Sequence, residues 1–213
     1  IIDEQQRFGV KQRRSLLEKG QNVDFLMMSA TPIPRTYAHF LFGDMDITNI
    51  KQMPPGRKPV CTRYIKGKSM APVLPEILEA IEKGKQCYVV CPSIEENEMA
   101  MRDATSIYNG MKKSLKNVRI GLLHGKLKKE EKEEVMNQFV KHEIDILVST
   151  TVIEVGIDVK NATYMVIYDA HRFGLSTLHQ LRGRCARSNE QGHCFLLSSS
   201  SDEQAIKRLQ MLE

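Results

Sequence analysis

Three arginines crowd around one glycine in the segment His-Gln-Leu-Arg-Gly-Arg-Cys-Ala-Arg at residues 179–187. Arginine keeps its charge at any working pH and offers a planar fork of hydrogen-bond donors. Such groups can neutralise the charge that builds on a phosphoryl group during its transfer. Taken alone, the segment is better explained as the basic end of a solvated surface helix, so the phosphoryl interpretation depends on the motifs that accompany it.

Acidic and hydroxyl residues follow the two apolar runs nearest the start of the sequence. Asp3 and Glu4 come directly after Ile1-Ile2, and residues 29–31 (Ser-Ala-Thr) close the run at 25–28. At the carboxyl end of a parallel strand, adjacent acids can hold Mg²⁺ and position a water for attack on a phosphate. The alternatives are a pair of surface acids and a helix cap, and each is the simpler explanation of its own motif.

Two further apolar runs end in groups that suit contact with a phosphodiester backbone. His124-Gly125-Lys126 follows the run at 118–123, and residues 150–158 follow the run at 144–149. A glycine permits close approach of the backbone, while lysine, hydroxyl and N–H groups bind phosphate oxygens. Ordinary turns explain both segments equally well, so they indicate a nucleic-acid contact only together with the other motifs.

The composition is that of an ordinary globular chain and sets few limits on function. The 213 residues are 41% hydrophobic and 27% charged, and 31 Lys and Arg against 26 Asp and Glu give a formal net charge of +5. This charge permits a polyanionic partner without proving one. Five cysteines without Cys-x-x-Cys spacing argue against a disulfide framework and a cysteine metal site, and no apolar run approaches a membrane span. The cytoplasm is therefore the expected location.

Apolar runs alternate with helical patterns along most of the chain, which predicts a parallel α/β sheet with helices on both faces. The predicted strands cover residues 1–2, 25–29, 60–65, 87–91, 118–123, 144–149, 164–168 and 194–197. Predicted helices include residues 74–81, which Gly84 stops, and an amphipathic helix that contains the charge run 128–134. A terminal helix is predicted to begin near Ser201, with Gln204 as its capping-box partner.

Three prolines and one glycine within residues 53–59 mark the clearest domain boundary, because they fit neither a helix nor a central strand. We therefore expect residues 1–52 to be the remnant of a first lobe and residues 53–59 to be a linker. Residues 60–200 are expected to form a complete second lobe, followed by the terminal helix at 201–213. Because Ile1-Ile2 leads straight into the acids without an initiator methionine, we also expect the chain to be part of a longer protein.

No phosphate-binding loop of the form Gly-x-x-x-x-Gly-Lys-Ser/Thr occurs in the sequence. Gly67-Lys68-Ser69 matches the end of that pattern, but residue 62 is threonine where the leading glycine is required. The chain thus has the acids and arginines of a nucleotide-driven motor without its phosphate cradle. We expect that cradle to lie upstream of Ile1 in the longer protein.

The motifs and their order resemble those of superfamily-two helicases, which are built from two RecA-like lobes. The resemblance covers nearly the whole chain and is greatest to the bacterial translocases that act on branched DNA. The matching segments are residues 3–10, 29–36, 54–57, 94–96, 150–158, 173–175 and 179–187. Residues 4–6, 54–57 and 94–96 favour this group over the transcription-repair coupling translocases, which remain the alternative within the superfamily.

The resemblance implies a role for each motif. Asp3 would help hold Mg²⁺ and Glu4 would orient or activate the attacking water, while Gln6 would sense the state of the nucleotide. Arg184 and Arg187 would reach the γ-phosphate of ATP, with Arg187 as the arginine finger. The other implied contacts are nucleotide binding by Gln180, Gly156 and Asp158, coupling by Ser29 and Thr31, and DNA binding by His124, Gly125, Lys126, Thr150 and Thr151.

The resemblance also implies ATP and Mg²⁺ as cofactors and forked or branched duplex DNA as the partner, with single-strand-binding protein as a further candidate. The implied activity is ATP-dependent translocation in DNA repair and recombination, and the isolated chain is expected to be inactive. Two positions depart from the family pattern, because Ala186 stands where glycine is usual and Cys185 stands where valine is usual. Ala186 favours a second hypothesis, a docking lobe without catalysis that binds nucleic acid or protein.

Overall fold

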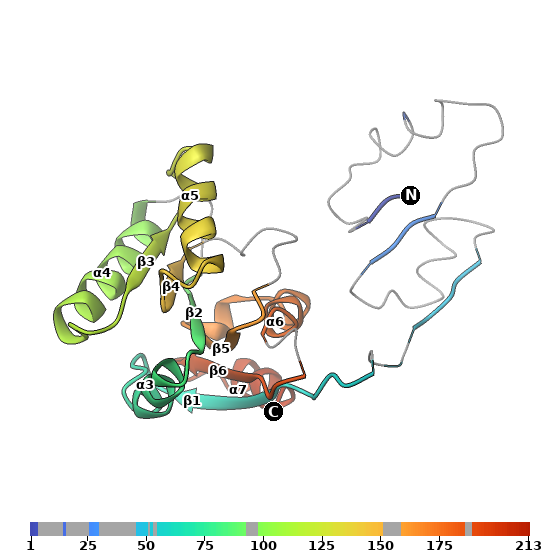
Figure 1. The fold of residues 1–213 in the computed structure, drawn as a ribbon. Helices are drawn as coiled ribbons and strands as arrows, with labels where there is room; N and C mark the ends of the chain where they lie inside the picture. Colours follow the sequence, from blue (N-terminus) through green and yellow to red (C-terminus); the bar gives the residue numbers. More distant parts are fainter. Residues whose placement is uncertain are drawn as a thin grey trace. The chain divides into compact units, whose positions relative to one another are not determined.

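The computed structural model describes residues 1–3, 15, 26–29, 46–50, 52, 55–92, 98–150, 159–185 and 189–213, with the backbone alone at 98–102. The chain divides into two compact units, Ile1–Met53 and Pro54–Glu213 (Figure 1). The division falls at the beginning of the proline-rich stretch 53–59. The assignment of these units to two motor lobes stays a prediction.

In the first unit, two extended segments lie side by side in parallel. Ile2 and Met27 form an isolated parallel bridge, flanked by two backbone hydrogen bonds of 2.8 Å, and Ile2 is buried. The bridge joins two of the segments predicted to be strands. Asp3 and Ser29 both follow the bridge in the chain direction, so the structure places these two candidate residues beyond neighbouring segments.

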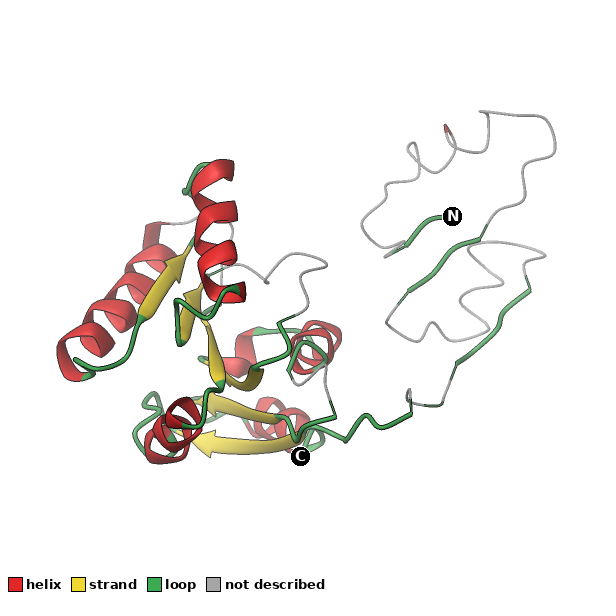
Figure 2. Cartoon of the chain, viewed as in Figure 1, coloured by secondary structure: helices red, strands yellow, loops and turns green. Residues whose placement is uncertain are grey.

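The second unit contains a six-stranded sheet in the order β1-β6-β5-β2-β4-β3, in which every pair of neighbours is parallel (Figure 2). The strands are β1 (Cys61–Lys66), β2 (Gln86–Val90), β3 (Ile120–Leu123), β4 (Ile146–Ser149), β5 (Ala162–Ile167) and β6 (His193–Ser198). The predicted parallel α/β class is confirmed. All six strands predicted from residue 60 onward are present, with ends that differ by at most two residues.

Helices cover both faces of this sheet. They are α3 (Leu74–Glu82), α4 (Glu98–Ser114), α5 (Lys129–Val140), the 3₁₀ turn η2 (Ala170–Arg172), α6 (Leu175–Arg182) and α7 (Glu203–Gln210). Successive side chains of a strand point to opposite faces. Accordingly, Tyr88 and Val90 of β2 join a core cluster with α5, α6 and α7, whereas Cys87 and Val89 join a second cluster with α3 and α4.

A buried side chain ties the end of α5 to the sheet. The amide of Gln86, at the start of β2, donates from Nε2 to the carbonyl oxygens of Phe139 and Ile144, both at 2.7 Å. The Phe139 carbonyl belongs to the last turn of α5, which lacks partners within the helix. The Phe139 ring packs on Tyr88 with centroids 4.9 Å apart. These contacts set the end of α5 against β2.

The terminal helix is confirmed, but its predicted capping box is wrong. Helix α7 begins at Glu203, and Asp202 caps it by accepting a hydrogen bond from the backbone N–H of Gln204 at 3.0 Å. The Asp202 carboxylate is one residue closer to the free N–H groups of the first turn than Ser201 is. Across the described residues, the helices are too short or too polar to span a bilayer.

Candidate functional site

The carboxyl ends of β3 and β4 bring two predicted nucleic-acid motifs together. Leu123 pairs with Ser149, and the N–H of Thr150 donates to the carbonyl of Leu123 at 3.1 Å. His124 and Thr150 are therefore the first residues beyond two adjacent parallel strands. The sequence placed each motif at a strand end, and the pairing of β3 with β4 makes them neighbours.

The segment His124-Gly125-Lys126 forms the turn between β3 and α5. Gly125 and Lys126 are exposed, and a Cβ added at Gly125 would meet nothing within 4 Å. Lys132 donates from Nζ to the Gly125 carbonyl at 2.9 Å, which holds the turn against α5. Within the described part of the chain, the buried Nδ1 of His124 has no hydrogen-bond partner. An open turn with two nitrogen-bearing side chains suits contact with phosphate oxygens.

Thr150 is less exposed to solvent than Gly125 and Lys126 of the turn. It is only 5% exposed, and its backbone N–H is used in the contact with β3. The side chain of Thr150 is therefore almost completely covered and does not protrude toward a DNA ligand. Three candidates from the same segment, Thr151, Gly156 and Asp158, lie outside the described residues.

Helix α6 carries the predicted nucleotide-contacting motif. Leu178 and Leu181 are almost completely buried, which fixes the rotation of the helix against the sheet. Gln180 and Arg184 are half-buried, and Gly183 is the residue at which the helix ends. The structure thus orients Gln180 and the segment leading to Arg184, whereas Arg187 lies outside the described residues.

Cys185 anchors the segment that follows Arg184. Its buried thiol donates to the Thr163 carbonyl at 2.8 Å and lies 3.4 Å from the His193 carbonyl. Burial raises the pKa of this thiol to about 12, so it stays protonated and remains a donor at neutral pH. A cysteine at this position therefore fills the core as a small apolar side chain and adds one hydrogen bond.

The two groups of candidates stand at different ends of the sheet. His124 and Thr150 follow the carboxyl ends of β3 and β4, whereas Cys185 contacts Thr163 and His193 near the amino ends of β5 and β6. The segment after α6 is therefore not part of the carboxyl edge that carries the nucleic-acid candidates. The nucleic-acid candidates and the nucleotide-contacting segment after α6 therefore lie at two separate surfaces of this unit.

One residue that contacts the arginine-bearing segment was missed by the sequence interpretation. Arg57 lies in the proline-rich linker and donates from Nη2 to the Gly183 carbonyl at 2.8 Å. The only signal for it in the sequence is its place in the segment Pro54-Pro55-Gly56-Arg57, which the resemblance includes without giving Arg57 a role. A contact across 126 positions has no local signature.

The first-unit candidates are described only in part. Asp3 is exposed and Ser29 is half-buried, while Glu4, Gln6 and Thr31 lie outside the described residues. Considering only the residues that the structure describes, no three His, Cys, Asp or Glu side chains are grouped so as to hold a metal ion. All five cysteines are free.

Comparisons with known proteins agree on the kind of lobe. Residues 70–189 match the helicase conserved C-terminal domain family. Over 214 aligned residues the chain is 51% identical to proteins named ATP-dependent DNA helicase RecG from Staphylococcus epidermidis and Staphylococcus aureus. The alignment covers 100% of this chain and 31% of each relative, so the chain spans about a third of their length.

Solved structures give the same result for the fold. A structure of RecG bound to a three-way DNA junction matches with a TM-score of 0.78 and 44% identity, over 99% of this chain and 27% of that chain. Dbp5 from S. cerevisiae, bound to RNA and ADP BeF3, matches with a TM-score of 0.68 and 17% identity, over 99% of this chain and 55% of that chain, which indicates a shared fold alone. The sheet of the second unit is a RecA-like helicase lobe, and the resemblance to branched-DNA translocases is confirmed by the likeness to RecG. The chain belongs to the helicase conserved C-terminal domain family.

Proposed function

We propose that the chain supplies the arginine-bearing lobe of an ATP-driven DNA translocase that acts on branched DNA in repair and recombination. The observation that carries the proposal is 51% identity over the whole chain to proteins named ATP-dependent DNA helicase RecG. The RecG structure that matches this fold is bound to a three-way DNA junction, which supports branched DNA as the partner. The cytoplasm is the proposed location, and single-strand-binding protein is a further proposed partner.

In the proposed mechanism, Arg184 and Arg187 stabilise the negative charge on the transferring γ-phosphate. Arginine side chains placed in this way contribute through electrostatic stabilisation of the transition state, and loss of such a group lowers kcat. Gln180, on α6, contributes to nucleotide binding together with Gly156 and Asp158. Cys185 holds the segment after Arg184 against the sheet by its hydrogen bond to Thr163.

The first unit is proposed to supply the groups around the metal. The exposed Asp3 carboxylate stands where an extended segment ends, and Glu4 follows it in the sequence. Carboxylate oxygens of this kind fit Mg²⁺ that is bound mainly through the phosphates of ATP. Glu4 would orient the attacking water, Gln6 would sense the nucleotide, and Ser29 with Thr31 would couple hydrolysis to movement.

The carboxyl edge of β3 and β4 is proposed to contact the DNA backbone. The contacts would come from His124, Gly125, Lys126, Thr150 and Thr151. Contacts to phosphate position a protein on DNA without reading its sequence. Such a surface fits a translocase, which must hold every sequence that it passes over.

The decisive experiment replaces Arg187 in the full-length protein that contains this chain. Arg187→Ala should lower ATP turnover at least about tenfold, equivalent to about 1.4 kcal/mol in the activation free energy, because the finger acts on the transition state. DNA affinity should stay within about twofold, since phosphate contacts on DNA are made elsewhere. The matched control is Lys83→Ala, which removes an exposed cation at the end of α3 that pairs with Glu79.

Two outcomes would overturn the proposal. Turnover that persists in Arg187→Ala would reject the finger and favour the docking lobe that Ala186 suggests. Appreciable hydrolysis by the 213-residue chain alone would also contradict the mechanism, because its sequence has no phosphate-binding loop.

A further inference from the structure

The linker before β1 contacts both ends of the segment that carries the arginines. Arg57 donates to the Gly183 carbonyl at 2.8 Å, and Gln191 donates from Nε2 to the Pro59 carbonyl at 2.6 Å. The first residue of β1 continues this pairing, since its N–H donates to the Gly192 carbonyl at 2.8 Å. The linker is therefore joined to residues on either side of Arg184 and Arg187.

The linker backbone also approaches this segment closely at Gly56. Gly56 has φ +81°, a conformation that side chains rarely adopt, and a Cβ there would lie 2.7 Å from Oδ1 of Asn189. Glu190, the next residue, forms an ion pair with Lys85 at the start of the sheet. Asn189 thus lies against the linker backbone, and Glu190 is held by Lys85.

The Arg57 contact falls on the peptide bond that leads into Arg184. The carbonyl of Gly183 and the N–H of Arg184 belong to one planar peptide group. The carbonyl accepts from Arg57, and the N–H donates to the Leu181 carbonyl at 2.9 Å. With both polar atoms held, this peptide plane has a fixed orientation, which fixes the position of the Arg184 Cα because that atom lies in the same plane.

The residue just past the end of α6 takes a distant partner. The turn after the helix satisfies the carbonyls of His179, Leu181 and Arg182, and Arg57 satisfies the carbonyl of Gly183 from a position 126 residues away. A cation at this place also interacts favourably with the negative end of the helix dipole.

We infer that Arg57 is a positioning residue for Arg184, so that the linker helps to fix where Arg184 lies. The inference rests on the proposed function, because Arg184 matters in this way only if it reaches a nucleotide. A displacement of about 1 Å in a group that acts on the transition state can cost about a hundredfold in rate. The linker is therefore part of the machinery that assembles the catalytic geometry.

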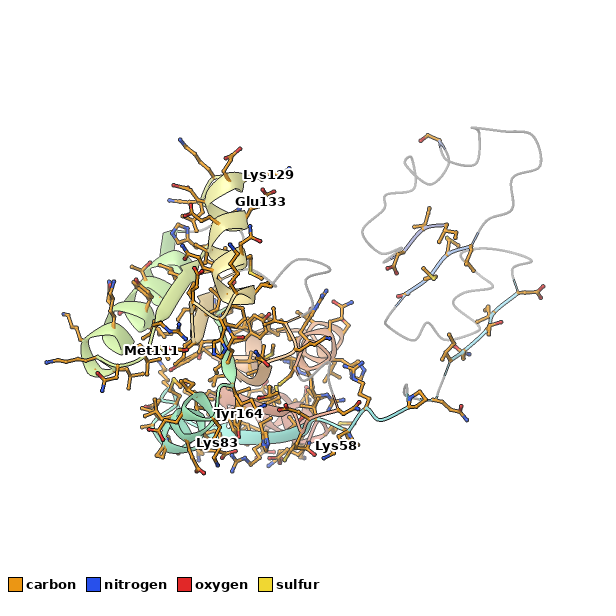
Figure 3. All side chains as sticks on the ribbon, viewed as in Figure 1. Lys58, Lys83, Met111, Lys129, Glu133 and Tyr164 are labelled. Carbon is orange, nitrogen blue, oxygen red and sulfur yellow. The ribbon has the colours of Figure 1, made fainter. Side chains whose placement is uncertain are left out.

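The test compares Arg57→Ala, Arg57→Lys and the control Lys58→Ala in the full-length protein. Lys58, labelled in Figure 3, is exposed and forms no hydrogen bond or ion pair within the described residues. DNA-stimulated kcat should fall about tenfold in Arg57→Ala, with the KM for ATP within about twofold, because Arg184, the group that Arg57 positions, is proposed to stabilise the transition state. Lysine can donate to the same carbonyl, so Arg57→Lys should recover to within about threefold of the unmodified rate.

Two further measurements keep a structural effect apart from a positioning effect. The melting temperature of Arg57→Ala should stay within about 3 °C of the parent, which corresponds to about 1 kcal/mol for a lobe of this size. If Arg57→Ala does not fold, Gln191→Ala removes the second contact to the linker and should lower kcat about threefold with unchanged KM. Unchanged kcat in both variants, or equal loss in Arg57→Ala and Lys58→Ala, would overturn the inference.

Failure of this inference is distinguishable from failure of the proposed function. If Arg184→Ala abolishes turnover while Arg57→Ala matches the parent, the arginines act as proposed and the linker does not position them. If neither Arg184→Ala nor Arg187→Ala lowers turnover, the proposed function itself is wrong.

Discussion

The carboxyl edge at β3 and β4 and the C-terminal end of α6 are built by different kinds of contact. His124 and Thr150 are placed by the pairing of two short strands that lie 26 residues apart at Ile120 and Ile146. The approach to Arg184 is placed by single hydrogen bonds: Arg57 donates to the Gly183 carbonyl, and the Cys185 thiol donates to the Thr163 carbonyl. The first region depends on a repeated ladder and the second on a few separate contacts.

This difference predicts how each region responds to damage. Several backbone hydrogen bonds maintain the pairing of strands in a ladder, so replacing one side chain changes the pairing little. A helix end held by single contacts moves when one of them is lost. Geometry at the arginines should therefore be sensitive to substitutions that leave the carboxyl edge unaffected.

The largest expected effect is on the anchoring of α6. Leu181 of α6 is fully buried in the core. Leu181→Ala should therefore lower the free energy of unfolding by about 3 kcal/mol, through lost burial and the cavity that the substitution leaves. The control Leu175→Ala, on the same helix but 41% exposed, should cost under about 0.5 kcal/mol. Denaturant titration measures both, and equal losses would show that the α6 contacts do not depend on this core.

A smaller effect is expected from the ion pair between Arg119, just before β3, and Asp145, just before β4. Asp145 accepts from the backbone N–H of Arg119 at 2.8 Å and from its guanidinium at 2.6 Å. Asp145→Ala leaves that N–H unpaired and should cost about 2 kcal/mol, against under about 0.5 for the exposed Glu143→Gln. A loss no larger than that of Glu143→Gln would show that the ladder alone sets the pairing of β3 with β4.

The lowered pKa of the Asp145 carboxyl predicts that stability depends on pH. Burial acts to raise the pKa of Asp145, but hydrogen bonds and charge from Arg119 outweigh it and hold the pKa below the ordinary 3.8. A carboxyl group with a lowered folded pKa contributes stability that is present above the unfolded value and lost as the pH falls through the folded value. Stability should therefore decline below about pH 4, and Asp145→Ala should flatten that decline. An unchanged profile would contradict the assignment.

The next prediction tests whether the carboxyl edge at β3 and β4, rather than the other end of the sheet, contacts DNA. In the full-length protein, Lys126→Ala should weaken DNA binding at every sequence and reduce the slope of affinity against salt concentration by about 1, because one phosphate contact is lost. Lys83→Ala, at the other end of the sheet and labelled in Figure 3, should leave the slope unchanged. Equal slopes for the two variants would place DNA elsewhere.

The smallest effect is on thiol reactivity, with one buried cysteine in each region. Burial raises the pKa values of Cys185 and Cys91 to about 12, so both should resist alkylation at pH 8 while the exposed Cys61 reacts. Arg57→Ala should accelerate labelling of Cys185 about threefold and leave Cys91 unchanged, because local opening exposes the thiol after α6. Peptide mass spectrometry measures each site, and parallel acceleration at both would indicate general destabilisation.

The sequence predicted the strands better than it predicted the helices and helix caps between them. Apolar runs revealed all six strands of the second unit, and several of these runs are continuously apolar because strands covered on both faces leave little choice of residue. Helix α4 has no such signature, and its range of Glu98–Ser114 was not predicted. The cap of α7 was misassigned by one residue, since Ser201 and Asp202 are both good caps and only the backbone path selects one.

Local pattern therefore determined the class of fold, the strand ends and the residue types that suit phosphate chemistry, because hydrophobic period and side-chain chemistry act over a few neighbouring residues. Tertiary structure alone decided that His124 lies beside Thr150, that Arg184 stands at the other end of the sheet, and that Arg57 holds the peptide before it. These relations join residues far apart along the chain, and they arise only when folding brings distant donors to carbonyls that no local partner satisfies.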